Sequence, residues 1–147
     1  MIKTLICGSR SITEYGYVAS AVSYAPFEPD MVITGGAAGV DNSGQAYAHS
    51  HSMDVKTVKP KYTEHGKRAP LKRNEAMVDE ANTIIAVWNK QSNGTEYTIQ
   101  YAKDNGFEED YRKSLEDGIV CIYLVEGSVF GDESSNTVQK KITFKPQ

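Results

Sequence analysis

The sequence has few cysteines, no excess of positive charge and no long hydrophobic run. Its 147 residues include only two cysteines, Cys7 and Cys121, and both lie in apolar segments typical of buried strands. We therefore expect small core residues in a reducing compartment rather than a disulfide framework or a metal site. The net charge of -3 offers no general attraction for nucleic acid or anionic lipid, so any bound anion must be held by local groups.

The sequence also shows no hydrophobic segment typical of a membrane span or a secretory signal. No apolar run approaches the roughly 20 residues that cross a bilayer. The first residues, Met1 to Ile6, lack the long apolar region and the cleavage site of a secretory signal. We expect a cytoplasmic protein without a membrane partner, in which residues 1–147 form one domain of ordinary globular composition.

Short apolar segments alternate with helical patterns from the start of the chain to about Gly106. The four expected strands are Lys3–Cys7, Met31–Thr34, Asp54–Lys59 and Thr83–Trp88. A helical pattern follows each of them, and the last two predicted helices span about 70–80 and 95–105. This alternation is typical of βαβ units. The predicted fold class is α/β, with a Rossmann-like parallel sheet flanked by helices.

The chain after Gly106 gives a mixed pattern. Ile119–Val125 is a continuous apolar run and predicts a fifth strand, which would complete a core of about residues 2–125. The polar segment Glu108–Gly118 is compatible with a short helix or an insertion. In the C-terminal extension 126–147 we expect an edge strand over Val138–Phe144, whose lysines discourage edge-to-edge pairing.

Three glycine-bearing loops follow predicted strands and lead directly into helices. They are Gly8–Arg10, Gly35–Asp41 and Ser92–Glu96. In a parallel sheet such loops meet at the carboxyl ends of the strands, where the free N–H groups of helix N-termini favour an anion. Glycine lets the backbone approach a phosphate, and serine and threonine hydroxyls add donors. Each loop alone is equally explained as a tight turn with capping residues, so the predicted phosphate site depends on their convergence.

A cluster of cations lies at the start of another predicted helix, the one over about 70–80. The segment Lys67–Asn74 places four cations at a helix start, where the macrodipole favours acidic residues instead. For Lys67 and Lys72 we favour a solvated basic turn. Arg73 shares a helix face with Met77, so its stem should point toward the sheet while its guanidinium reaches the strand ends. Arg73 is therefore the main candidate for a charged contact with a ligand.

Other residues leave two interpretations open. Asp41 either caps its helix or accepts a hydrogen bond from a ribose hydroxyl. Trp88 either stacks on a base or covers the core. The three histidines lack metal-ligand spacing, and we expect no metal or other cofactor. The candidate ligand-binding residues are Gly8, Ser9, Arg10, Gly35, Gly36, Ala37, Gly39, Asp41, Arg73, Asn74, Trp88, Ser92, Gly94 and Thr95.

The order of these motifs resembles the SLOG superfamily, and within it the YspA-like branch of small stand-alone domains. The matching motifs, spread over residues 2–106, are Gly8-Ser9-Arg10, Gly35–Asp41, Lys59-Pro60, His65-Gly66, Arg73-Asn74 with Met77, Ala86-Val87-Trp88 and Ser92-x-Gly94-Thr95. The superfamily includes the LOG nucleotide hydrolases, the DNA-uptake protein DprA and predicted nucleotide sensors of bacterial and phage conflict systems. The resemblance implies a Rossmann-like sheet with a nucleotide-type pocket.

The resemblance also bears on catalysis. LOG enzymes cleave the N-glycosidic bond of nucleoside monophosphates with the arginine of an Arg-x-x-x-Met motif and a glutamate three residues after the threonine of a glycine loop. Arg73 and Met77 match the first motif, but Thr98 stands where the glutamate belongs. Glu96, two residues earlier on the helix, points about 200° away. We therefore expect a protein that senses or sequesters a phosphate-bearing nucleotide or a derivative of NAD or ADP-ribose. The alternative is an N-glycosidase or phosphoribohydrolase that uses Glu96 or Asp41.

The sequence also bears on two possible macromolecular partners, nucleic acid and a second copy of the chain. DprA binds single-stranded DNA, but this chain has no basic stripe with interleaved aromatics, so we do not expect nucleic acid as a partner. LOG relatives commonly form dimers. Here Tyr97, Tyr101, Phe107 and Tyr111 supply aromatic surface for a two-fold contact, or else cover the core. We expect a homo-oligomer, most simply a dimer.

Overall fold

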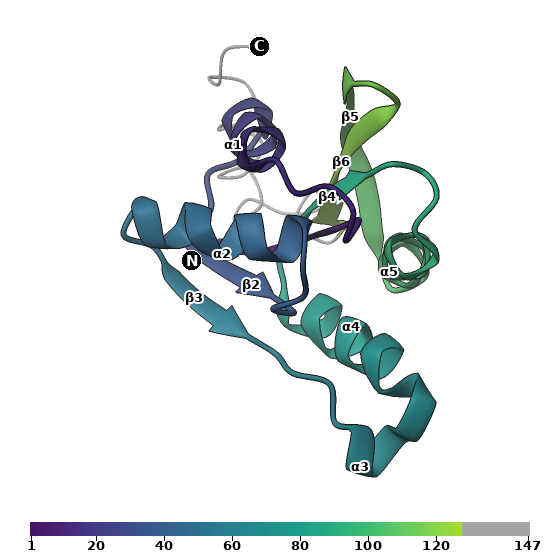
Figure 1. Cartoon of the computed structure of the whole chain (residues 1–147). Coiled ribbons are helices and arrows are strands. Elements are labelled where there is room, and N and C mark those ends of the chain that lie inside the picture. The colour runs from purple at the N-terminus through teal and green to yellow at the C-terminus, as the bar shows by residue number, and fades with distance from the viewer. Residues whose placement is uncertain (128–147) are drawn as a thin grey trace.

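Residues 1–127 are described from a computed structural model, in which one six-stranded sheet carries helices on both faces (Figure 1). The strands are β1 (Lys3–Gly8), β2 (Met31–Thr34), β3 (Asp54–Thr57), β4 (Thr83–Trp88), β5 (Phe107–Glu116) and β6 (Ile119–Glu126). The α-helices are α1 (Tyr15–Tyr24), α2 (Val40–Ser50), α3 (Tyr62–His65), α4 (Ala69–Glu80) and α5 (Asn93–Asp104). A single 3₁₀ turn, η1 (Gly66–Arg68), connects α3 to α4.

The sheet has a parallel core and an antiparallel edge. Its strand order is β3-β2-β1-β4-β6-β5. Strands β1 to β4 pair in parallel, whereas β6 runs antiparallel to β4 and forms a hairpin with β5. The predicted α/β fold with a Rossmann-like sheet is therefore confirmed, and the predicted fifth strand is β6.

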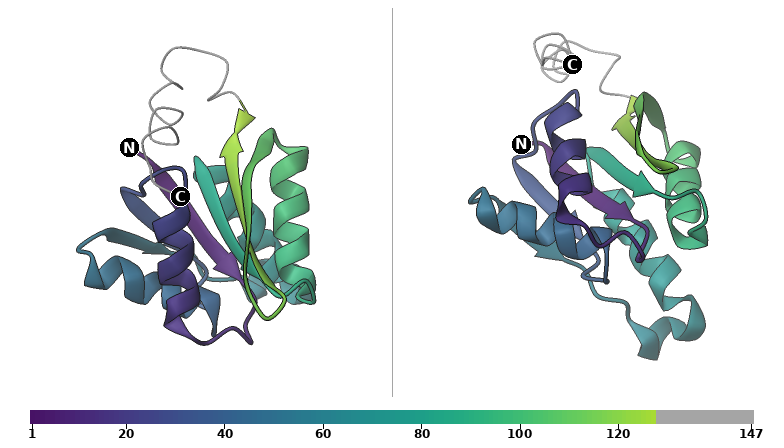
Figure 2. Two further views of the ribbon diagram at one scale, coloured as in Figure 1. Left: turned by 90° about the horizontal axis from the view of Figure 1, so that it is seen from above. Right: turned by 45° about the horizontal axis from the view of Figure 1, so that its top comes forward.

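Two apolar clusters pack against opposite faces of the sheet, and Figure 2 shows α1 and α5 on opposite sides of the strands. One cluster joins α1 and α2 to the strands through Ile6, Val18, Val22, Val40, Ala48 and Tyr123. The other joins α4 and α5 to the strands through Leu5, Met77, Val78, Ile84, Ile99 and Leu124. The helical spacing of these apolar positions explains why each helix lies on one face of the sheet.

The segment after Gly106 differs from its prediction. A helix or insertion over Glu108–Gly118 is wrong, because Phe107–Glu116 forms the ten-residue edge strand β5. As an edge strand, β5 pairs only with β6 and keeps many of its side chains in solvent, so charged residues are tolerated and the apolar alternation is weak. Two register shifts in its pairing with β6 weaken that pattern further.

Other boundaries shift by a few residues. Strand β3 ends at Thr57 rather than Lys59, and the polar loop after it contains the short helix α3 and the turn η1. Helix α5 begins at Asn93, two residues before the predicted start. The expected edge strand Val138–Phe144 and nearly all of the extension 126–147 lie outside the described residues.

The remaining sequence-level expectations concern cysteines and membrane spans. Cys7 and Cys121 are unpaired and buried, as predicted for core residues. Within residues 1–127, no helix has the length and apolar character needed to cross a membrane.

Candidate functional site

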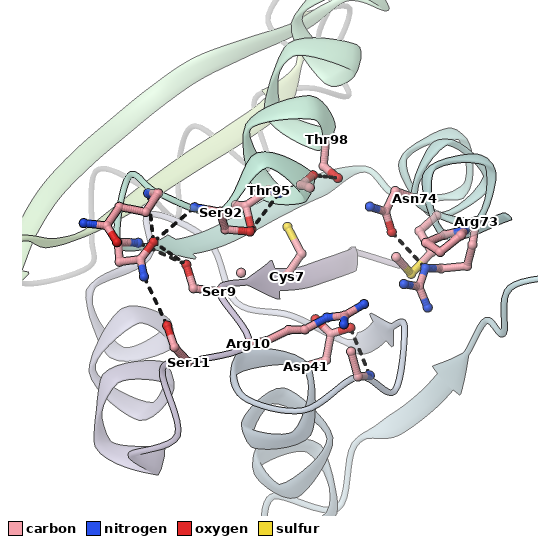
Figure 3. A pocket seen from close by; sticks show the side chains of 17 residues that line it. Cys7, Ser9, Arg10, Ser11, Asp41, Arg73, Asn74, Ser92, Thr95 and Thr98 are labelled. Atoms are coloured by element: carbon pink, nitrogen blue, oxygen red, sulfur yellow. Dashed lines mark hydrogen bonds between the residues drawn. The ribbon is translucent and has the colours of Figure 1, made fainter. Parts of the chain in front are cut away.

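A cavity of about 380 Å³ lies at the carboxyl ends of β1 and β4 (Figure 3). The chain runs outward from β1 to β2 and β3 and then returns to β4 on the other side of β1. At this reversal of strand order the loops diverge, which opens a crevice where ligands of such sheets usually bind. The lining residues are Cys7, Gly8, Ser9, Arg10, Ser11, Ala37, Asp41, Pro70, Arg73, Asn74, Met77, Asn89, Gln91, Ser92, Gly94, Thr95 and Thr98.

The structure brings most of the candidate residues together in this cavity. Those that line it are Gly8, Ser9, Arg10, Ala37, Asp41, Arg73, Asn74, Ser92, Gly94 and Thr95. Gly35 and Gly36 instead line a second cavity of about 520 Å³ beside β3, and Gly39 lines a third of about 440 Å³ near the start of α2. Trp88 and Glu96 line none of these three cavities.

Arg73 is a buried cation on the first turns of α4. Its side chain shares a helix face with Met77, as its spacing predicts, and only 9% of the residue is exposed. Nε donates to Asn74 Oδ1 at 2.8 Å, and Nη1 donates to the carbonyls of Gly35 and Val58 at 2.8 and 3.4 Å. Arg73 is thus directed toward the Gly35–Gly39 loop, as expected. Within residues 1–127, Nη2 has no hydrogen-bond partner, so one end of the guanidinium is left for the cavity.

Asp41 is the carboxylate of the cavity. It lies in the first turn of α2, is 7% exposed, and its Oδ2 accepts from the Ala37 N–H at 3.3 Å. It is not the N-cap, which is Gly39, so the capping interpretation is corrected to a contact that ties the preceding loop to the helix. Burial raises the pKa of Asp41 from 3.8 to about 6, although the Ala37 hydrogen bond and the charges of Arg73 and Arg10 lower it.

The two arginines differ in how they are held. Burial lowers the pKa of Arg73, and the nearby Asp41 charge opposes that shift. Arg10 is exposed at the cavity rim, and its guanidinium makes no hydrogen bond or ion pair with any described residue. Figure 3 shows the Arg10 side chain beside Asp41. The cavity therefore has one fixed cation and one that is free to move toward an incoming anion.

Asn89, which the sequence analysis did not select, connects two walls of the cavity. Its Oδ1 accepts from Ser9 Oγ at 3.0 Å and from the N–H groups of Gln91 and Ser92 at 2.9 and 3.2 Å. Its Nδ2 donates to Ser11 Oγ at 3.1 Å, and its own N–H donates to Ser9 Oγ at 3.1 Å. The loops after β1 and β4 are thereby joined, and the buried Ser9 hydroxyl serves the fold rather than a ligand.

Hydroxyl groups at the start of α5 are also partly used by the protein. Ser92 is the N-cap, and its Oγ accepts from the N–H and the Oγ1 of Thr95 at 3.3 and 3.0 Å. Thr98 Oγ1 donates to the Gly94 carbonyl at 2.9 Å. The threonine hydroxyls therefore stabilise the first turn of α5, while Gly94 in the same turn lines the cavity.

Several glycines of the predicted phosphate loops are required by the fold. A Cβ on Gly8 would lie 2.0 Å from the Val87 carbonyl oxygen, and one on Gly35 would lie 2.5 Å from Arg73 Nη1. Gly39 has a φ of 77°, in the left-handed region that favours glycine. The loop around Gly35 also satisfies some of its own donors, because the Gly36 N–H donates to Thr34 Oγ1 at 3.3 Å.

Gly94 behaves differently from these glycines. A Cβ built on it would meet no atom within 4 Å, and its φ lies outside the left-handed region. Neither a close approach nor a strained turn requires glycine at this cavity-lining position. Access of an external group to the backbone of α5 would explain it.

Trp88 and Glu96 lie outside the cavity for local reasons. The Trp88 indole donates to the Ser92 carbonyl at 3.0 Å and packs against the α4–α5 side of the core. Of its two interpretations, this position matches the one in which Trp88 covers the core. Glu96 is exposed on α5, whereas Thr98 lines the cavity. The turn of the helix therefore separates Glu96 from the site, as its spacing predicts.

The tyrosines considered for a dimer contact mostly have partners within the chain. Tyr97 donates to Glu75 and Tyr101 to Asp79, at 2.8 Å for the second pair, so both tie α5 to α4. Phe107 is buried, and the ring of Tyr111 lies 5.4 Å from that of Tyr123. This arrangement matches the core-covering alternative.

The cavity also contains residues that the sequence analysis missed, namely Cys7, Ser11, Pro70, Met77, Asn89, Gln91 and Thr98 in their role as lining residues. A signal for Asn89 and Gln91 existed, because both lie in the loop directly after a predicted parallel strand. No group of three or more metal-ligating side chains occurs in the part of the chain that the structure describes. Comparison with protein-family models and with curated proteins gives no match.

Proposed function

We propose that this protein binds a phosphate-bearing nucleotide derivative in the cavity between the ends of β1 and β4, and that it senses or sequesters this ligand. The observation that carries the proposal is Arg73. A guanidinium that is nine-tenths buried, fixed by two carbonyls and left with an unpartnered Nη2 at a cavity is arranged for an anion. Burying such a cation is costly unless its charge is compensated, and the nearby Asp41 carboxylate opposes this cost without removing it, since the pKa of Arg73 is still lowered.

The start of α5 supplies a second set of donors. Gly94 lines the cavity at the N-terminal end of a twelve-residue helix, where unpaired N–H groups and the helix dipole favour negative charge. In the proposed complex, the phosphate accepts hydrogen bonds from these N–H groups and from Arg73 Nη2. Arg10 moves from solvent to the same anion.

The rest of the cavity suits a sugar or base more than a bare phosphate. Its volume of about 380 Å³ falls in the range of small-molecule sites. Apolar atoms of Pro70, Met77 and Cys7 line it beside the hydroxyl and amide groups. Asp41 offers a carboxylate acceptor for a ribose hydroxyl. These features support a nucleoside phosphate or a derivative of NAD or ADP-ribose, as the resemblance to the SLOG superfamily implies.

One observation favours a second function, hydrolysis of an N-glycosidic bond. Asp41 is a carboxylate in the cavity, and its pKa of about 6 would let it exchange a proton near neutral pH. Glu96, the other candidate, is exposed and lies outside the cavity. If the protein is a nucleotide hydrolase, Asp41 rather than Glu96 is the residue to carry the reaction.

The experiment that separates these functions follows both binding and free base. The protein is titrated calorimetrically with AMP, NAD and ADP-ribose, and each mixture is then analysed by chromatography. Saturable binding without release of base supports a sensor or sequestering protein. Release of base that disappears in Asp41→Asn and persists in Glu96→Gln would establish the hydrolase instead. No binding of any of the three would refute the preferred proposal.

Assembly and location stay predictions at this point. A dimer is still proposed, and light scattering at micromolar concentration tests it. A single species with the mass of one chain would refute it. Cytoplasmic location is likewise proposed and is tested by fractionating cells that express the tagged protein.

A further inference from the structure

Asn74 follows Arg73 on α4, and both residues line the cavity at the ends of β1 and β4. Asn74 is half-buried in the middle of this helix and belongs to neither apolar cluster. Asparagine is a poor residue for a helix interior, because its side chain competes for backbone hydrogen bonds. Neither helix formation nor core packing therefore explains this residue, and its polar contacts remain as the reason for its position.

The guanidinium of Arg73 has two edges, and the fold takes up only one of them completely. Nη1, which lies on the same side as Cδ, donates to the carbonyls of Gly35 and Val58. Nε and Nη2 form the opposite edge, whose parallel N–H bonds suit two oxygens side by side. Asn74 Oδ1 accepts from Nε at 2.8 Å and so occupies one of these two oxygen positions. The position at Nη2 is left for an oxygen of a ligand.

The bond to Nε also fixes which way the Asn74 amide faces. Nε can only donate, so the amide oxygen must face it and the amide nitrogen must face elsewhere. Figure 3 shows this nitrogen turned away from Arg73, toward the open part of the cavity. Within residues 1–127, no group accepts a hydrogen bond from Nδ2. Asn74 therefore presents a donor, and not an acceptor, to whatever enters the cavity.

We propose that Asn74 Nδ2 donates to the same phosphate that accepts from Arg73 Nη2, so that α4 offers the anion a locked pair of donors. This inference rests on the proposed function. A ligand oxygen at Nη2 lies beside Asn74 Oδ1, and two neighbouring oxygens repel each other. A contact from Nδ2 to the phosphate offsets this repulsion. Because the bond from Nε to Oδ1 already holds both side chains, the pair binds without first being ordered.

Aspartate at position 74 would keep the bond to Arg73 and reverse the contact with the ligand. Asn74→Asp retains an oxygen for Nε but replaces the amide nitrogen by a second, negatively charged oxygen. Asn93→Asp is the matched control, because Asn93 is exposed and precedes the cavity-lining Gly94 without lining the cavity itself. It adds the same charge near the site and removes no proposed donor. Thermal melting confirms that each variant is folded.

Dissociation constants for AMP and ADP-ribose are measured calorimetrically on the unaltered protein and on both variants. We expect Asn74→Asp to weaken binding by at least roughly tenfold, and Asn93→Asp to weaken it far less. Unchanged affinity in Asn74→Asp would overturn the proposal. Equal losses in the two variants would overturn it as well, because charge alone would then explain both.

Nuclear magnetic resonance on the unaltered, ¹⁵N-labelled protein separates a contact with the ligand from a role in positioning Arg73. The side-chain amide signals of Asn74 are identified by their absence from the spectra of Asn74→Asp and Asn74→Ala. AMP should move these signals downfield with the dissociation constant found by calorimetry, whereas adenosine, which lacks the phosphate, should leave them in place.

The outcomes distinguish the role of Asn74 from the proposed function. Asn74 signals that stay in place while AMP saturates the protein would show that Asn74 only positions Arg73, and would overturn the proposal. An equal shift with adenosine would overturn it too, because the contact would then not be with the phosphate. If neither AMP nor ADP-ribose binds the unaltered protein, the proposed function itself fails.

Discussion

Replacing Gly94 with alanine separates a requirement of the fold from a requirement of the ligand. A Cβ at Gly94 meets no atom within 4 Å, so the methyl group fits the unliganded protein. Alanine also favours the helical conformation by about 0.5–1 kcal/mol over glycine in a helix interior, and by less in a first turn. We therefore expect Gly94→Ala to be neutral or to raise the melting temperature by about 1–3 °C.

The effect on the ligand should have the opposite sign. If a phosphate accepts a hydrogen bond from the start of α5, the added methyl group keeps it from approaching the Gly94 backbone. Hydrogen bonds that involve a charged group contribute about 1.5–3 kcal/mol, which corresponds to roughly ten- to a hundredfold in affinity. We thus expect a protein that is at least as stable as the original and binds AMP or ADP-ribose much more weakly.

Gly16 provides a matched control. It is the second residue of α1, as Gly94 is the second residue of α5, and a Cβ on it also meets no atom within 4 Å. Gly16 does not line the cavity. Gly16→Ala should therefore show the same small change in melting temperature with unchanged affinity by calorimetry. Unchanged affinity in Gly94→Ala as well would refute the phosphate contact at α5.

Three further predictions concern the residues around the cavity. Because burial raises the pKa of Asp41 to about 6, its contribution to stability is complete below about pH 4 and is lost as pH rises through about 6. Denaturant unfolding should therefore show the free energy of unfolding of Asp41→Asn rising, relative to that of the unaltered protein, by up to roughly 2–3 kcal/mol between pH 4 and pH 8. A free-energy difference that stays constant over this range would contradict a buried carboxyl with a raised pKa. Asn89→Ala should lower the free energy of unfolding by roughly 2–3 kcal/mol and weaken nucleotide binding, because it leaves Ser9 and Ser11 without their shared partner. Asn89→Asp, which keeps the Oδ1 acceptor, should be milder in denaturant unfolding, and equal losses would argue against this connection. Glu96→Gln should leave the dissociation constant for AMP unchanged, since Glu96 lies outside the cavity, and weaker binding by calorimetry would place it at the site.

The fold could be predicted where one physical signal was dominant. The buried strands β1, β2 and β4 are covered on both faces, so their sequences are apolar runs that stand out between helical patterns. Strand β5 was missed because its exposed side tolerates charge and breaks the apolar alternation, although Asp117-Gly118, both with positive φ, forms the two-residue turn of its hairpin with β6.

The site could be predicted only in part, because sequence motifs do not reveal which donors the protein itself uses. Arg73 followed from its spacing to Met77 on one helix face. Ser9 was selected for its hydroxyl, but that hydroxyl is taken by Asn89, a contact between residues 80 positions apart. Gly39 was selected with its loop, yet the path of the backbone turns it into a different cavity. Such outcomes depend on tertiary contacts that local patterns do not contain.

The most direct test of the central claim is a crystal structure of the protein bound to whichever of AMP, NAD or ADP-ribose binds most tightly by calorimetry. The account predicts a phosphate within hydrogen-bond distance of Arg73 Nη2 and of the Gly94 N–H, in the cavity between the ends of β1 and β4. A phosphate bound in either of the other two cavities, or no binding of any of the three nucleotides, would contradict it.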